Sequence, residues 1–398
     1  MQKTIYVDSI LVNAEWKAQQ VMIVENGTIS DIVDAAKFAT GNEMTANSKD
    51  LASKVNVDER IEGTVIPGYV DTQVNGGGGV MFNHAPTLES VNTIANAHAR
   101  FGTTSLFPTL ITDDFATISS AADAISQAIR LNHPSIMGVH FEGPHLSVAK
   151  KGVHKAAHIR SISDEELAVY TRKDIGQVIV TVAPENVSPE VIQALVSENV
   201  VVALGHSNAP YEVVQRALDA GATGFTHLFN AMSPLTSREP GMVGAALLSD
   251  AICGLIVDHQ HLHKKSAELA CKVKSEKGIM LVTDAMAHVG GKQDTVAFFD
   301  TEITRTSTRT GEKLTTPDGT LAGSCLDMHS ALRHCVNDLG ITLKSASVMA
   351  STTASCFTCT QRNIGQLVPG TAANFVVLDD KLNLKAVWQR GLNIHNND

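Results

Sequence analysis

From Thr64 onward the chain alternates between short apolar segments and longer segments with helical periodicity, and this alternation limits the possible folds more than any other feature. Eight strand-like segments lie at residues 64–74, 104–110, 136–142, 178–184, 200–206, 224–229, 252–258 and 279–284. Helical patterns between them cover residues 88–101, 115–131, 189–199, 211–220 and 264–277. The third to eighth strands are almost continuously apolar, as expected for parallel strands that are covered on both faces. Eight such units predict the α/β class and a (β/α)8 TIM barrel.

The two ends of the chain have a different pattern from the barrel region. Residues 1–63 contain repeated short strand patterns, and the tail at residues 365–398 also reads as strands and turns. We therefore expect both ends to form one small β-sandwich domain beside a catalytic barrel at residues 64–364. Within the barrel, Thr-rich alternation and turn residues predict a hairpin insert at about residues 293–321. The sequence leaves open whether this insert acts as a lid.

Composition excludes several classes of function. The chain has 398 residues, of which 43% are hydrophobic and 18% charged, and its formal net charge is −10. Such a chain can bury a large core, and without a Lys/Arg block it is poorly suited to bind nucleic acid. Neither an apolar run of membrane-spanning length nor a signal-peptide pattern is found, so no membrane partner is expected. Six scattered cysteines suggest reduced thiols and a cytoplasmic location.

Residues that can bind a metal or transfer protons stand at the ends of several predicted strands. They are Gln73 and Asn75 in the first strand, Glu142 in the third, His206 in the fifth, His227 in the sixth and Asp284 in the eighth. In a TIM barrel these C-terminal ends meet on one face, where barrel enzymes carry out their chemistry. A single histidine at a strand end is usually structural, but this many polar residues at equivalent ends indicates an active site.

Glu142, His206 and His227 form a set of two histidines and one carboxylate. Three protein ligands leave one coordination position for water, as in catalytic zinc sites. The ion would lower the pKa of that water so that hydroxide is available near neutral pH. These ligand types suit Zn²⁺, and Fe²⁺, Co²⁺ or Mn²⁺ would also fit. Asp284 is then the expected acid/base, which takes up a proton and returns it to a leaving amine.

Longer motifs connect the chain to a known family. They are PGYVDTQVNGGGG, TTSLFPTLIT, GVHFEGPHLSVAKKGVH, VTVAPE, ALGHSNA, THLFNAMSPLTSREPG, LVTDA and GTLAGS, in an order that covers the whole barrel. The tail IGQLVPGTAANFVVLD is similar to the segment that closes the β domain in the same superfamily. In these motifs the chain resembles the amidohydrolase superfamily and, through GHSNA and THLFNAMSPLTSREPG, its N-acetylglucosamine-6-phosphate deacetylase branch.

The resemblance implies a metal-dependent hydrolysis of N-acetyl-D-glucosamine 6-phosphate to D-glucosamine 6-phosphate and acetate. This step belongs to amino-sugar catabolism and cell-wall recycling. Two alternatives stay open. The substrate could be another N-acetylated sugar phosphate such as N-acetylgalactosamine 6-phosphate, because an epimer differs only in the orientation of one hydroxyl. The chain could also be a non-catalytic barrel that binds a sugar phosphate, although the three ligands and Asp284 are all present.

The resemblance also implies roles for residues near the predicted centre. In the deacetylase branch a Gln-x-Asn pair can replace the His-x-His pair of relatives, so Gln73 and Asn75 imply one divalent ion per subunit. Neutral amides are weak ligands for a transition metal, and Gln73 can instead hydrogen-bond the nucleophilic water or the substrate. His154 matches a histidine that binds the acetamide carbonyl, where it would stabilise the developing oxyanion together with the metal.

Further residues are implied to bind the sugar phosphate. The resemblance places Asn230 and the backbone of Ala231 against it, and Arg238 in contact with the phosphate, whose oxygens match the parallel donors of a guanidinium. It also implies a homodimer in which His261 reaches the phosphate in the neighbouring subunit. Because His259, His261 and His263 alternate in DHQHLH, a second metal site is another interpretation of this segment. For His259 and His263 we expect surface exposure.

Overall fold

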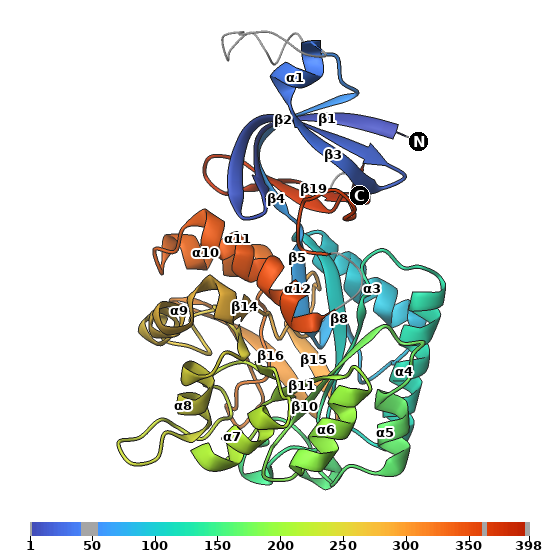
Figure 1. Cartoon of the computed structure of the whole chain (residues 1–398). Helices are drawn as coiled ribbons and strands as arrows, with labels where there is room; N and C mark the ends of the chain where they lie inside the picture. Colours follow the sequence, from blue (N-terminus) through green and yellow to red (C-terminus); the bar gives the residue numbers. More distant parts are fainter. Residues whose placement is uncertain (1, 41–54, 360–363, 395–398) are drawn as a thin grey trace.

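The computed structural model describes residues 2–40, 55–359 and 364–394, which form a barrel with a smaller sheet domain beside it (Figure 1). The barrel strands are β5 (Tyr69–Val74), β8 (Thr103–Ile111), β9 (Gly138–Glu142), β10 (Gln177–Val182), β11 (Val201–Leu204), β12 (Gly224–Phe225), β13 (Ile252–Leu255) and β14 (Ile279–Leu281). Each strand pairs in parallel with the next one along the chain. A parallel bridge between Val74 and Ala285 joins the two ends of the sheet, so the barrel is nearly closed. The predicted TIM barrel is confirmed.

Helices cover the outside of the barrel (Figure 1). They are α3 (Leu88–Ala99), α4 (Phe115–Arg130), α5 (Asp164–Tyr170), α6 (Pro189–Ser197), α7 (Tyr211–Asp219), α8 (Gly241–Leu248), α9 (Lys264–Gly278), α10 (Met328–Asn337), α11 (Leu343–Ala350) and α12 (Thr352–Thr358). The five helical patterns predicted between the strands match α3, α4, α6, α7 and α9. In α4, Asp114 caps the N-terminus by accepting from the Thr117 N–H, and Ile118 and Ile125 lie on its buried face. By contrast, α8 was not predicted, because almost all of its residues are buried and it lacks a polar face.

The strand predicted at residues 64–74 is two strands in the structure. Its first part belongs to β4 (Glu59–Pro67), which pairs with β1 and β18 in the small domain. The barrel strand β5 begins after Gly68, where an added Cβ atom would lie 2.3 Å from Thr104 Oγ1. The predicted domain boundary between residues 63 and 64 therefore falls inside β4. The apolar run continues through both strands, so hydrophobic periodicity gives no sign of the break.

The small β domain combines both ends of the chain. Its strands are β1 (Gln2–Val12), β2 (Glu15–Glu25), β3 (Thr28–Asp34), β4, β18 (Phe375–Leu378), β19 (Leu384–Gln389) and β20 (Leu392–Asn393), and α1 (Ala35–Thr40) follows β3. They form one mixed sheet in the order β20-β19-β18-β4-β1-β2-β3. The predicted assembly of a small β domain from both ends is confirmed. Phe375 and Trp388 stack with ring centroids 5.1 Å apart in its core, so strands from the C-terminal end complete the core of the N-terminal ones.

The insert after β14 contains three antiparallel strands, β15 (Thr295–Phe298), β16 (Thr301–Thr308) and β17 (Gly311–Thr315). The predicted hairpin is thus present, with one additional strand. Phe298, Ile303 and Leu314 pack with Met286 and Ile111 at the mouth of the barrel.

A second short hairpin, β6 (Gly76–Gly77) and β7 (Val80–Met81), follows β5. Among the described residues, no helix has both the length and the apolar character needed to cross a membrane.

Candidate active site

The polar residues predicted at the strand ends lie around one cavity at the C-terminal face of the barrel. Glu142 is the last residue of β9, whereas His206, His227 and Asp284 follow the ends of β11, β12 and β14 by two or three residues. All four line a cavity of about 170 Å³; Glu142, His206 and His227 are buried and Asp284 is partly buried. The cavity is lined by Asn75, Ile111, Glu142, Gly152, Val153, His154, His206, His227, Asn230, Ala231, His261, Asp284, Met286, Leu321 and Gly323.

Three of the four strand-end residues have a backbone conformation that non-glycine residues rarely adopt. The φ angles are 46° at His206, 35° at His227 and 54° at Asp284. Such conformations cost on the order of 1–3 kcal/mol each and concentrate at functional sites. At Asp284, hydrogen bonds on both sides hold the backbone, because its N–H donates to the Gln73 carbonyl at 3.0 Å and its carbonyl accepts from the Ser324 N–H at 2.9 Å. The strain supports a functional role for these strand ends.

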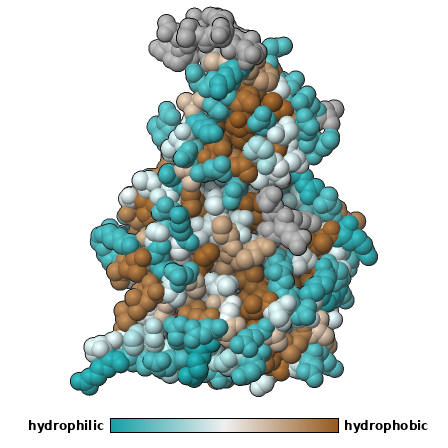
Figure 2. All heavy atoms as spheres, viewed as in Figure 1, coloured by the Kyte–Doolittle hydropathy of each residue, from teal (hydrophilic) through white to brown (hydrophobic). Residues whose placement is uncertain are grey.

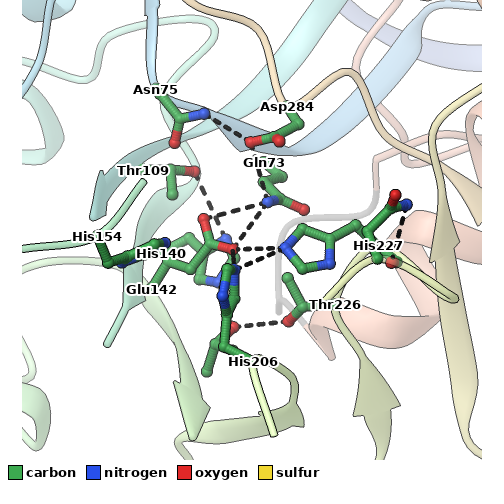
Figure 3. Close-up of polar contacts among 12 residues, drawn as sticks. Gln73, Asn75, Thr109, His140, Glu142, His154, His206, Thr226, His227 and Asp284 are labelled. Carbon is green, nitrogen blue, oxygen red and sulfur yellow. Dashed lines mark hydrogen bonds and ion pairs between the residues drawn. The ribbon is translucent and has the colours of Figure 1, made fainter. Parts of the chain in front are cut away.

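The side chains of Glu142, His206 and His227 converge on a single point (Figure 3). The two histidine Nε2 atoms are 2.9 Å apart, and they lie 3.3 Å (His206) and 3.0 Å (His227) from Glu142 Oε1. The Nδ1–H of His206 donates to the Lys150 carbonyl at 2.8 Å, which leaves its Nε2 lone pair facing the cluster. Nitrogen and oxygen atoms this close together fit ligands of one ion bound at about 2.0–2.2 Å. The cluster is therefore a candidate metal site.

Gln73 and Asn75 turn their amide nitrogens toward the carboxylates of the site (Figure 3). Gln73 Nε2 donates to both oxygens of Glu142 and to Asp284 Oδ1, each at 3.1 Å. Asn75 Nδ2 donates to Asp284 Oδ1 at 2.6 Å. Nitrogen donors in these positions hold the carboxylates and offer no lone pair to a second ion. Asn75 Oδ1 is buried and has no hydrogen-bond partner among the described residues, so it is available to accept from a ligand.

Asp284 is a carboxylate in an environment that favours proton uptake. Burial raises its pKa to about 6, and the nearby charge of Glu142 also acts in this direction. The hydrogen bond from Asn75 opposes the shift by stabilising the charged form. A carboxyl group with a pKa near 6 can both accept and donate a proton close to neutral pH.

His154 lies beside the cluster, in the loop between the 3-10 turns Val148–Lys150 and Ala156–His158. Its ring centroid is 4.4 Å from that of His206. Its Nδ1 lies 2.8 Å from Thr112 Oγ1 and 3.4 Å from the Thr112 backbone nitrogen. Because the backbone N–H can only donate, Nδ1 is the acceptor and Nε2 carries the proton of the neutral ring. Burial lowers the pKa of His154 well below its usual value, and this keeps the ring neutral. His154 is thus a neutral hydrogen-bond donor at the cavity, although its position also allows it to bind a metal with Glu142 and His206.

Of the four residues predicted to bind the sugar phosphate, Asn230, Ala231 and His261 line the cavity and Arg238 does not. Asn230 and Ala231 are lining residues, and the Ala231 carbonyl accepts from the Ser207 N–H at 3.0 Å. Arg238 is absent from the lining and belongs to an exposed segment at residues 236–239. This segment leads into α8 and protrudes at the lower left of the molecule (Figure 1), where the surface is hydrophilic (Figure 2). The structure thus does not bring Arg238 to the cavity of its own chain.

The prediction that His261 reaches the phosphate in a neighbouring subunit stays a prediction. Within its own chain, His261 lies at the cavity. The reason is the turn after β13, where Asp258 holds the side chain over the barrel. His261 Nδ1 is 2.6 Å from Asp258 Oδ2, and the His261 N–H donates to Asp258 Oδ1 at 2.8 Å. A side chain fixed in this way points into its own site.

Several apolar lining residues were not singled out from the sequence. Ile111, Met286 and Leu321 form part of the wall, and they carry no chemical signal that distinguishes them from core residues. Gly323 was present in the motif GTLAGS, which could have indicated it. Its φ is 56°, and an added Cβ atom would lie 2.6 Å from Met286 Cγ, so only glycine fits without displacing the wall.

Comparison with known proteins agrees with the architecture and the site. Residues 64–394 match the model of the amidohydrolase family. An N-acetylgalactosamine-6-phosphate deacetylase of Shewanella sp. (strain ANA-3) is 49% identical over 330 residues, which cover 83% of this chain and 82% of the relative. An N-acetylglucosamine-6-phosphate deacetylase of Haemophilus influenzae is 34% identical over 313 residues, which cover 78% and 81% of the two chains.

Solved structures give the same result over nearly the whole chain. The N-acetylglucosamine-6-phosphate deacetylase from Pasteurella multocida superimposes with a TM-score of 0.88 at 30% identity, covering 98% of this chain and 99% of the other. A mutant deacetylase from Mycobacterium smegmatis, in complex with N-acetyl-D-glucosamine 6-phosphate, has a TM-score of 0.87 at 26% identity, covering 98% and 99% of the two chains. The chain therefore belongs to the amidohydrolase family, in the branch that contains the N-acetylhexosamine-6-phosphate deacetylases.

Proposed function

We propose that the chain hydrolyses the acetamide of an N-acetylhexosamine 6-phosphate and releases acetate and the free hexosamine 6-phosphate. The observation that carries this proposal is the convergence of Glu142, His206 and His227 on one point, with Asp284 beside them in the same cavity. The relatives described above are deacetylases of such sugar phosphates, which supports the reaction class. All four side chains are present, so a barrel without catalysis is the weaker alternative.

The polar groups around the candidate metal site each have a part in this reaction. One divalent ion bound by Glu142, His206 and His227, which Zn²⁺ suits, would activate a water molecule and polarise the acetamide carbonyl. Asp284 takes a proton from the water while the new carbon–oxygen bond forms, and Asn75 and Gln73 hold its carboxylate in place. The Nε2–H of His154 donates to the carbonyl oxygen as negative charge develops there. Asp284 then transfers its proton to the nitrogen as the carbon–nitrogen bond breaks.

We propose N-acetyl-D-galactosamine 6-phosphate as the preferred substrate. The motifs of the chain alone favour the gluco epimer, whereas the identity of 49% to a galactosamine-type deacetylase supports the galacto epimer. Relatives of the glucosamine type are 29% to 35% identical, as in Vibrio furnissii, Haemophilus influenzae and Homo sapiens. A relative of the galactosamine type from Escherichia coli O157:H7 is also 34% identical, so the argument depends on the Shewanella protein.

Acetate release from the two epimers tests this choice. We expect kcat/KM for the galacto epimer to exceed that for the gluco epimer by about tenfold, because one well-placed hydrogen bond to a hydroxyl contributes roughly 0.5–1.5 kcal/mol. The inverse ratio would assign the chain to the gluco epimer. If neither sugar phosphate released acetate from the metal-loaded protein, the deacetylase proposal itself would be wrong.

The phosphate of either substrate requires a cation that the cavity wall does not provide. Among the described residues that line the cavity, none is Lys or Arg. The volume of about 170 Å³ is below the roughly 300–1,000 Å³ of typical ligand pockets, so the substrate must extend toward the surrounding loops. We propose a homodimer in which Arg238, on its protruding segment, binds the phosphate in the cavity of a second copy of the chain. His261 would contact the phosphate from within its own chain.

Replacing Arg238 with alanine should reduce the preference for phosphorylated over unphosphorylated substrate by about one to two orders of magnitude. The reason is that a hydrogen bond to a charged group contributes roughly 1.5–3 kcal/mol. The preference is measured as the ratio of kcat/KM values for the two forms of the sugar. Arg216→Ala, which removes an exposed arginine of α7, is the matched control and should leave the ratio unchanged. An unchanged ratio in Arg238→Ala would remove this residue from phosphate binding.

A further inference from the structure

A second group of metal-binding side chains lies outside the cavity. His259 follows β13, while His334 is in the last turn of α10 and Asp338 is the C-cap of the same helix. One ligand atom from each of the three lies within 4.8 Å of the other two. None of the three lines the cavity that contains Glu142, so this group is separate from the candidate active site.

The orientation of each side chain in this group suits a ligand. His334 Nδ1 is 2.6 Å from the Val257 carbonyl, so Nδ1 carries the proton and the Nε2 lone pair is available. A backbone carbonyl in this position is the usual partner of a metal-binding histidine. His334 and Asp338 are four residues apart and share one face of the helix end. From the neighbouring loop, His259 Nε2 approaches Asp338 Oδ2 to 3.0 Å, and its ring centroid is 4.7 Å from that of His334.

An ordinary ion pair does not account for the whole arrangement. A surface pair between His259 and Asp338 would contribute only about 0–1 kcal/mol. His259 nevertheless has a φ of 62°, in the left-handed region, and such a conformation costs a non-glycine residue on the order of 1–2 kcal/mol. Moreover, within the described part of the chain, His334 Nε2 makes no hydrogen bond and lies beside this pair. A metal ion bound by all three side chains would account both for the φ of His259 and for the position of His334 Nε2.

We propose that His259, His334 and Asp338 form a second divalent-cation site that takes Zn²⁺ or a similar ion. Two imidazole nitrogens and one carboxylate oxygen suit this class of ion, whereas Mg²⁺ and Ca²⁺ prefer a site made of oxygen ligands alone. The three side chains range from half-buried to exposed, and the side chain of Asp338 is 41% exposed. Water can therefore compete for the ion, which binds more weakly and exchanges more easily than an ion at the buried centre.

The site would join three parts of the molecule that meet at the loop after β13. Asp258 in this loop holds His261 at the cavity. Gln260 Nε2 donates to Thr308 Oγ1 at 3.1 Å and to Thr310 Oγ1 at 2.8 Å, so the loop is also attached to the β16–β17 turn. An ion on His259 and α10 fixes the same loop from a third side. Occupancy of the second site therefore limits the motion of the loop that carries His261.

Metal binding to the intact protein tests the proposal. Protein whose buried centre has been loaded with Zn²⁺ is dialysed to remove loosely bound ions and then titrated with Zn²⁺, with bound metal measured by equilibrium dialysis. We expect one additional equivalent, and slower amide hydrogen exchange in the loop at residues 258–261 once it is bound. His334→Ala and Asp338→Asn should each weaken this additional equivalent by at least about tenfold, since even outer-shell changes at metal sites cost 10–100-fold. Both variants should retain the first equivalent.

His263→Ala is the matched control, because His263 belongs to the same DHQHLH segment, is exposed and lies outside the group. It should bind both equivalents as the unmodified protein does. Asp338→Asn keeps the size of an exposed side chain, so it gives a result even if His334→Ala does not fold. The proposal is overturned if no additional equivalent binds. It is also overturned if that equivalent persists in Asp338→Asn, or if His263→Ala removes it to the same extent.

Discussion

Asp284→Asn should lower the rate of acetate release by about 10²–10⁴-fold, the usual contribution of a general acid–base group. The amide keeps the size and shape of the side chain, but it can neither accept the proton of the water nor return one to the leaving nitrogen. Asn75 Nδ2 and Gln73 Nε2 now donate to Asp284 Oδ1 at 2.6 and 3.1 Å, and the amide oxygen can still accept one of these hydrogen bonds. The measurement is kcat with saturating substrate, accompanied by substrate affinity and metal content.

The control for this variant is Asp219→Asn, which makes the same change on the exposed side of α7 and should leave kcat unaltered. Metal content and substrate affinity should be retained in Asp284→Asn, because this residue is not one of the three convergent ligands. If the variant kept more than about a tenth of the rate, the acid–base role would have to be given to another group of the cavity.

Glu142→Gln should remove the tightly bound ion and lower kcat/KM by at least about 10³-fold. An ion in such a site provides several kcal/mol of transition-state stabilisation, and each 1.36 kcal/mol corresponds to a factor of ten in rate. The carboxylate is the one anionic ligand in the triangle with His206 and His227, and a neutral amide is a much weaker ligand. Elemental analysis after mild dialysis should fall from close to one equivalent per chain to a small fraction of one.

Glu198→Gln, a change at an exposed glutamate, should keep both the ion and the activity. The role given to Gln73 and Asn75 predicts one tightly bound ion at the barrel centre. Two tightly held equivalents in the unmodified protein would contradict this role. The more exposed group at His259 does not confuse this result, because mild dialysis removes a weakly bound ion and Asp338→Asn identifies it separately.

The sequence predicted the barrel and the composition of its centre because both follow from local patterns. Continuous apolar runs mark parallel strands, and the barrel topology then brings Glu142, His206 and His227 to one face. The order of the strands along the chain was enough to predict that these three residues share one face. The exact strand ends were not needed, because β12 ends at Phe225 and His227 lies beyond it. The same reasoning found Asp284 and the amide pair of the first strand.

The remaining features depend on contacts that no local pattern records. The break at Gly68 is set by the approach of Thr104 from the next strand. The direction of His261 depends on the turn made by Asp258. The tautomer of His154 depends on Thr112, the residue after β8. The contacts at Gly68 and His154 join different β/α units, and the contact at His261 lies within one loop. Hydrophobic periodicity reveals neither kind of contact.

The sheet shared by the two ends of the chain has a consequence for biosynthesis. β4 pairs with β1 on one side and with β18 on the other, and β18 leaves the ribosome only after the entire barrel has been made. Until then the nascent chain carries an exposed β-edge, which is a template for association with other chains. N-terminal segments usually fold first during synthesis, but here the first domain to emerge is the last to be completed. We therefore expect the yield of folded protein to depend on shielding of this edge during synthesis and on the integrity of the final strands.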